Sequence, residues 1–115
     1  LTDKPARFFV NEIIREKALL LYQKEVPYSI EAIVEEFKEE TDIIRIRAII
    51  LVERDTQKGI VIGHKGESLK RLGTLARKDI ELFFEKKVFL QLYVKVEKDW
   101  RNRDNLLKNF GYKLE

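Results

Sequence analysis

The chain has 115 residues, of which 44% are hydrophobic and 37% charged, and its net charge is +3. This length suits a single domain, and the charged fraction exceeds the usual level of about 25%, so we expect a packed core beneath a highly charged surface. The absence of cysteine excludes disulfides and thiolate metal sites, and no apolar run approaches the roughly 20 residues that a membrane helix needs. The chain starts at Leu1 without a secretory signal, which suggests a processed chain or an excised domain.

The first predicted element is a helix over residues 6–25. Val10, Ile14 and Ala18 recur at helical spacing and give it one apolar stripe. Pro27 ends it, because the residue before a proline is pushed out of the α region.

Two strands follow, over residues 30–38 and 45–54. The polar segment 39–42 between them is short, so we expect an antiparallel hairpin. The first strand alternates poorly and its acidic residues suggest a solvated edge, whereas the second has a clear period of two. Its apolar face consists of Ile46, Ala48, Ile50 and Val52.

A short helical segment and a glycine loop at residues 63–66 lead into a long helix over residues 67–84. A strand over residues 88–97 and a C-terminal helix over residues 103–110 complete the order. The crossover before the last strand allows parallel pairing. The predicted class is α+β: a three-stranded mixed sheet with all helices on one face, forming one domain over residues 1–115.

The charge along this chain is uneven. Residues 7–40 contain 5 Lys/Arg and 8 Asp/Glu, whereas residues 45–78 contain 9 Lys/Arg and 3 Asp/Glu. A local basic excess is typical of a surface that binds a polyanion. A solvated charged surface is the alternative, and charge alone does not decide between them.

The glycine loop "GHKG" lies inside this basic region, and its residues suggest phosphate binding. A nucleotide-binding P-loop needs G-x-x-x-x-G-K-[ST]. Here His64 stands where the second glycine belongs, and Gly66 follows Lys65 where Ser or Thr is required. This spacing argues against a nucleotide site.

The loop fits the backbone of a nucleic acid better. Glycines let a sugar-phosphate chain approach the main chain, and the N-terminus of the following helix favours an anion. This is the layout of a KH module, whose G-x-x-G loop binds about four nucleotides of single strand. The predicted RNA-binding residues are Gly63, His64, Lys65, Gly66, Ile60, Ile62, Lys58, Arg54, Lys70, Arg71 and Arg77. Ile60 and Ile62, with Ala48 and Ile50, are expected to form an apolar floor beneath the bases.

Other chemistry has little support in the sequence. His64 is the single histidine, and no nucleophile–base pair or set of metal ligands accompanies it, so we predict no enzyme activity, metal or cofactor. Trp100 is expected to pin the C-terminal helix. Phe89 and Tyr93 point away from the core face of their strand, where they can either stack on RNA or pack between elements.

Three segments resemble the C-terminal KH domain of the Era family of bacterial ribosome-assembly GTPases. They are "VPYSI" (residues 26–30), "ILVERDTQKGIVIGHKGESLKRLGTLARKDIE" (residues 50–81) and "VFLQLYVKVEKDWRNRDNLLKNFGY" (residues 88–112). The resemblance implies a type II KH fold whose loop glycines are Gly63 and Gly66. It also implies binding to single-stranded sequence near the 3′ end of small-subunit ribosomal RNA, and a role in assembly of that subunit.

The family's N-terminal GTPase domain has no counterpart in these residues. GTP hydrolysis would therefore belong to a parent protein. We expect a cytoplasmic monomer without membrane insertion, although the resemblance also implies a peripheral position at the inner membrane face. The alternative is a KH-fold domain that docks a GTPase or a ribosomal protein without binding RNA.

Overall fold

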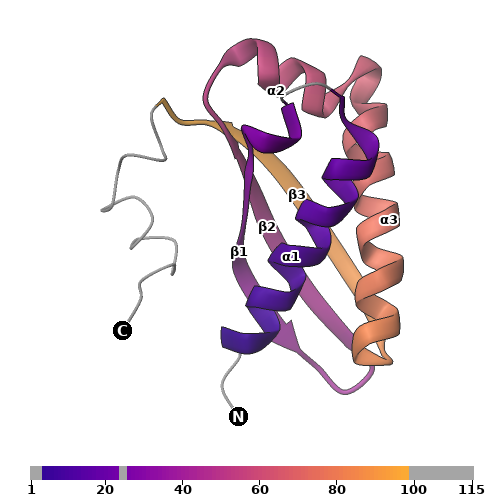
Figure 1. Ribbon diagram of the computed structural model, residues 1–115. Coiled ribbons are helices and arrows are strands. Elements are labelled where there is room, and N and C mark those ends of the chain that lie inside the picture. Colours follow the sequence, from indigo (N-terminus) through magenta and orange to yellow (C-terminus); the bar gives the residue numbers. More distant parts are fainter. Residues whose placement is uncertain (1–3, 24–25, 99–115) are drawn as a thin grey trace.

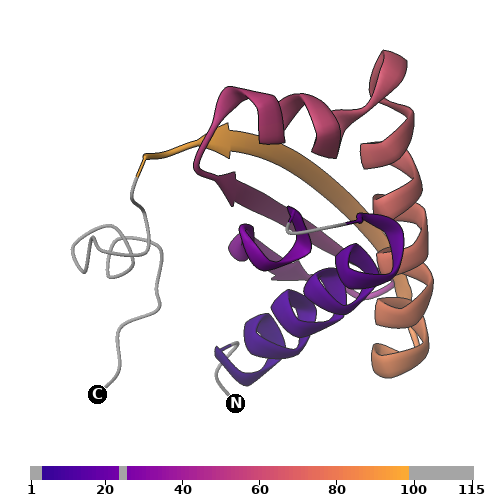
Figure 2. The same cartoon turned by 45° about the horizontal axis from the view of Figure 1, so that its top comes forward.

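The computed structural model describes residues 4–23 and 26–98. The elements run in the order α1 (Lys4–Leu21), η1 (Val26–Tyr28), β1 (Glu31–Glu39), β2 (Ile43–Val52), α2 (Asp55–Ile62), η2 (His64–Gly66), α3 (Glu67–Phe84) and β3 (Lys87–Val96). Figures 1 and 2 show α1 and α3 on the same face of the sheet, with α2 across one end. The expected fold class, a mixed sheet with helices on one face, is confirmed. The predicted C-terminal helix and Trp100 lie outside the described residues.

The three strands are ordered β1-β2-β3, with β1 antiparallel and β3 parallel to the central β2. The helix-facing side chains of β2 are therefore covered from both sides and are almost completely buried. They are Ile44, Ile46, Ala48, Ile50 and Val52. The expectation that Ala48 and Ile50 contact bases is wrong, because both are 0% exposed under the helices.

Edge strand β1 is irregular, and α1 compensates for the irregularity. The register with β2 shifts between Val34 and Glu36, which leaves main-chain groups without strand partners. Buried Asn11 accepts a hydrogen bond from the Val34 amide at 3.0 Å, and Arg7 donates to the carbonyls of Val34 and Glu35, each at 3.3 Å. These contacts fix α1 across the edge of the sheet.

The observed bounds differ from the predicted ones by a few residues. Helix α1 ends at Leu21, four residues before the predicted end, and β2 spans Ile43–Val52, two residues earlier than predicted. Strand β1 begins and ends one residue later, and β3 one residue earlier, whereas α3 has the predicted bounds.

Tyr22 directly follows α1 and links this helix to α2, the helix that leads into the glycine turn. Its hydroxyl donates a hydrogen bond to the Val61 carbonyl at 2.8 Å, which holds α2 next to the end of α1. Burial raises the pKa of Tyr22 to about 12.

This shift predicts a loss of stability at alkaline pH. Above pH 10 the unfolded chain loses the tyrosine proton, whereas the folded chain keeps it until about pH 12. Stability should therefore fall across this window, by up to about 3 kcal/mol. Urea unfolding at pH 9, 10 and 11 measures the slope. Tyr22→Phe should reduce the dependence of the unfolding free energy on pH. The hydrogen bond from Lys17 to Asp79 raises the Lys17 pKa in both proteins and so contributes equally to the two slopes. An equal slope in Tyr22→Phe would contradict this assignment.

Candidate nucleic-acid interface

Helix α2 begins with a side-chain cap and ends in the glycine turn. The Gln57 Oε1 atom accepts hydrogen bonds from the amides of Glu53 and Arg54, both at 2.9 Å, and so fixes the first turn. Val61 is completely buried and anchors the last turn in the core. The turn that follows therefore projects from a rigid support.

The turn needs glycine at two positions for different reasons. Gly63 has φ 77° and ψ 177°, and a Cβ there would lie within 2.7 Å of the Ser68 Cβ and closer still to its Oγ. Gly66 has φ 77° and ψ 9°, but open space surrounds its Cα. The first glycine is thus required by internal packing. The second leaves the surface clear for a ligand.

The two side chains between the glycines are exposed. Lys65 adopts the left-handed conformation, with φ 54° and ψ 27°, and the Gly66 amide bonds to the Gly63 carbonyl at 3.1 Å. The turn therefore presents His64 and Lys65 to solvent at the start of α3. No side chain caps that helix start, although the Glu67 amide bonds to the His64 carbonyl. An anion at this point would face the positive end of the helix dipole.

Helix α3 lies beside β3 and leaves a groove between them. Leu72, Ala76 and Ile80 are completely buried. A Cβ added at Gly73 would lie 3.6 Å from the Leu92 Cδ1 atom, in ordinary van der Waals contact, so α3 and β3 are close together at this point. The groove has a volume of about 350 Å³. We call it the α3–β3 groove, and its lining residues are Gly66, Leu69, Lys70, Gly73, Thr74, Arg77, Leu90 and Leu92.

The main chain of β3 also faces this groove. Strand β3 is an edge strand, and the Glu97 amide bonds to the Val52 carbonyl of β2 at 2.8 Å. The Val88 amide instead bonds to the Glu81 Oε2 atom of α3 at 3.0 Å. Because alternate residues of a strand bond to the same side, the amides and carbonyls of Leu90 and Leu92 point to the free edge. They are thus available to base edges.

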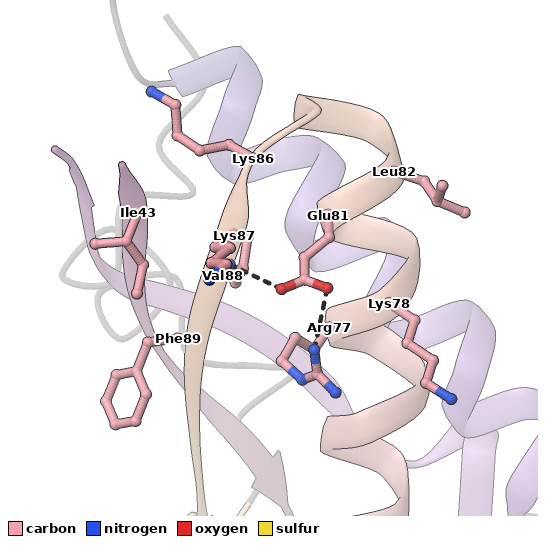
Figure 3. A pocket seen from close by; sticks show the side chains of 9 residues that line it. All are labelled: Ile43, Arg77, Lys78, Glu81, Leu82, Lys86, Lys87, Val88 and Phe89. Carbon is pink, nitrogen blue, oxygen red and sulfur yellow. Dashed lines mark hydrogen bonds and ion pairs between the residues drawn. The ribbon is translucent and has the colours of Figure 1, made fainter. Parts of the chain in front are cut away.

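Glu81 holds Arg77 at the far end of the groove. Its Oε1 atom is 3.0 Å from the Arg77 Nη1 atom, while its Oε2 atom accepts the Val88 amide. The pair fixes the guanidinium next to β3 (Figure 3). Because Glu81 partly neutralises Arg77, Lys70 carries the stronger free charge in the groove.

The structure brings together only some of the predicted residues. Gly66, Lys70 and Arg77 line the groove, with Gly63, His64 and Lys65 in the turn at its end. Lys58, Arg54 and Arg71 do not line it. Ile60 and Ile62 are about 200° apart around α2 and cannot share one floor; Ile60 is 51% exposed.

Leu90, Leu92 and Thr74 were missed as site residues. The alternating pattern of β3 assigned the two leucines to the core, and they are only partly buried because β3 is at the edge.

No helix among the described residues is both long and apolar enough to cross a membrane. Within residues 4–23 and 26–98, no group of three metal-binding side chains is present.

Comparison with known proteins agrees with this geometry. Residues 25–101 match the KH domain family. With its mixed three-stranded sheet and G-x-x-G turn, the chain belongs to this family, as a KH domain of type II.

Within that family the chain is a KH domain of the Era kind. It is 42% identical to Era from Aquifex aeolicus, solved as a point variant bound to GDP and AlF4−, with a TM-score of 0.87. The match covers 98% of this chain and 38% of that one. A structure of Era with MgGDPNP and nucleotides 1506–1542 of 16S ribosomal RNA gives the same identity and TM-score over 97% of this chain and 38% of that chain. The chain thus spans well under half the length of these relatives.

Proposed function

We propose that this domain binds single-stranded RNA in the α3–β3 groove, as the RNA-binding domain of an Era-like GTPase. The observation that carries the proposal is the free main-chain edge of Leu90 and Leu92 directly beside the G-x-x-G turn. Phosphates would approach Gly66 and the start of α3, where no side chain intervenes. The bases would then lie along β3.

The parts of the groove suit different parts of a nucleotide. Lys65, Lys70 and Arg77 supply cations for phosphates, which position the strand without reading its sequence. Leu90 and Leu92 supply both apolar contact and main-chain donors and acceptors, which distinguish bases only when those bases are unpaired. The site therefore favours single strand over duplex.

The target we propose is the 3′ end of small-subunit ribosomal RNA. The support is the likeness to Era, whose complex contains nucleotides 1506–1542 of 16S ribosomal RNA. Under this proposal the partner is the small ribosomal subunit during assembly in the cytoplasm, and the domain acts as a monomer. It has no catalytic role and needs no cofactor, and any GTPase activity lies in another domain of a longer protein.

A salt titration tests the proposal. With three to four phosphate contacts, the logarithm of the association constant for an oligonucleotide from that segment should fall with the logarithm of salt concentration, with a slope of about −2 to −3. Fluorescence anisotropy between 50 and 300 mM salt measures it. A hairpin duplex of equal length is the control and should bind more weakly. Lack of binding to the single strand at low salt would contradict the proposal.

A second candidate function, protein docking, is favoured by an aromatic patch on the helices. Phe8, Phe9 and Phe83 are 56%, 42% and 51% exposed, and the rings of Phe9 and Phe83 are 4.7 Å apart. Exposed aromatic clusters are typical of protein interfaces. This patch lies on α1 and the end of α3 and does not line the groove, so both functions are compatible.

A further inference from the structure

The two sides of the α3–β3 groove offer different hydrogen bonds to a ligand. On the strand side, the main chain of Leu90 and Leu92 presents both amides and carbonyls. On the helix side, Lys70 and Arg77 offer donors alone, because a protonated amine and a guanidinium have no acceptor. The remaining polar side chain is that of Thr74. Among the side chains that line the groove in the described part of the chain, it alone carries an acceptor.

The hydroxyl proton of Thr74 is already used within α3. The Thr74 Oγ1 atom is 3.0 Å from the carbonyl oxygen of Lys70, one turn earlier in the helix. A carbonyl carries no proton, so the hydroxyl is the donor in this bond. The bond also selects one of the two rotamers that threonine adopts in a helix. Thr74 therefore offers a ligand the lone pairs of an oxygen atom whose position is fixed.

The groove is narrow beside this oxygen. Gly73 has no side chain, and a Cβ added there would lie 3.6 Å from the Leu92 Cδ1 atom, so helix and strand are close together at this level. A base that reaches the main chain of β3 here also lies near Thr74. The phosphates of a nucleotide carry acceptors and are repelled by Oγ1, whereas its base can donate.

Resting on the proposed function, we propose that Thr74 selects a base with an exocyclic amino group, adenine or cytosine, at the nucleotide beside it. Adenine N6 and cytosine N4 donate hydrogen bonds, whereas guanine and uracil carry an acceptor oxygen at the corresponding position. Such an oxygen would place two acceptors together with no proton between them. Since the phosphate contacts do not read sequence, Thr74 adds discrimination at one position of the strand.

The test combines two variants of the chain with RNAs that differ by single chemical groups. An unpaired oligonucleotide from the 3′-terminal segment of 16S ribosomal RNA is made in versions that replace one adenosine by purine riboside, or one cytidine by zebularine. Each analogue lacks only the amino group. Thr74→Val removes the hydroxyl at nearly constant size, and Thr74→Ser keeps it. Fluorescence anisotropy measures the affinity of each chain for each RNA.

At one position of the strand, loss of the amino group should weaken binding to the parent chain by about fivefold, the effect of one hydrogen bond. Thr74→Val should bind that analogue and the unmodified RNA equally well, whereas Thr74→Ser should retain the difference. A general disturbance of the groove would not produce this pattern, because it would weaken all the RNAs alike.

Identical losses in the parent chain and in Thr74→Val at every position would overturn the role of Thr74. Tighter binding of an analogue to the parent chain, abolished in Thr74→Val, would also overturn it, because Thr74 would then act against the amino group. Failure of the parent chain to bind any of these RNAs would instead overturn the proposed function itself.

Discussion

A variant with His64→Asp and Lys65→Asp is expected to lose at least about a hundredfold in affinity for single-stranded RNA, because it replaces a cation by two negative charges at the point of closest phosphate approach. The fold should survive. Both side chains are exposed, and aspartate tolerates the left-handed conformation that Lys65 adopts at φ 54°. Anisotropy measures the affinity, and urea unfolding measures the stability.

The control for this variant is Lys4→Asp with Lys38→Asp. It changes the net charge by at least as much, but at α1 and β1, outside the groove. If the two variants weaken binding equally, the effect is one of overall charge, and the turn has no special role. A much larger loss in the loop variant assigns the phosphate contact to residues 63–66.

Gly63→Ala and Gly66→Ala are expected to have opposite effects. At Gly63 the backbone lies in a region that only glycine populates, and the added methyl would overlap the Ser68 side chain. We expect a loss of about 3 kcal/mol or more in the free energy of unfolding. At Gly66 nothing lies within 4 Å, so the cost is only that of the left-handed conformation, about 1 kcal/mol.

Binding should reverse this order at temperatures where both variants are folded. The Gly66→Ala methyl projects into the open groove and keeps the sugar-phosphate backbone from the main chain, so RNA affinity should fall tenfold or more while stability changes little. Urea unfolding and anisotropy on both variants separate the two roles. A Gly66→Ala variant that binds as tightly as the parent would show that RNA does not approach the turn at that glycine.

The fold was predictable where a local pattern agrees with its tertiary setting. The alternation from Ile44 to Val52 marks the central strand, and Leu72, Ala76 and Ile80 mark the buried face of α3. The end of α1 was not predictable, because residues 22–25 favour helix and the helix stops where Tyr22 turns to the Val61 carbonyl. That contact spans 39 positions and overrides local propensity.

Tertiary contacts also decide which side chains are buried at the end of α3. Phe83 follows Ile80 by three positions, a spacing that predicts a place on the buried face of α3, yet it is 51% exposed and contacts Phe9. The Phe84 ring centre instead lies 5.6 Å from that of Phe37 in β1. Which of two adjacent aromatic residues is buried depends on how the neighbouring elements are placed, and the sequence does not state that placement.

One part of the candidate site is predictable from the sequence and the other part is not. The glycine turn follows from sequence, because its spacing and its flanking residues are local. The groove depends on strand order, which the sequence does not give. The alternation of β3 predicts Leu90 and Leu92 as core residues. They border a groove because β3 lies at the edge of the sheet, with Gly73 of α3 close to it. Ile60 looked equivalent to Ile62 in the sequence. The predicted short helical segment already implied that residues two positions apart point to different sides, and α2 has this form.

The most direct test of RNA binding in the α3–β3 groove is a titration of the 15N-labelled domain with an unpaired oligonucleotide from the 3′-terminal segment of 16S ribosomal RNA. Amide shifts are followed residue by residue. We expect the largest changes on Gly66, Lys70, Gly73, Leu90 and Leu92, with little change along β1. Largest changes on the Phe8, Phe9 and Phe83 patch, with the groove amides unmoved, would contradict this expectation.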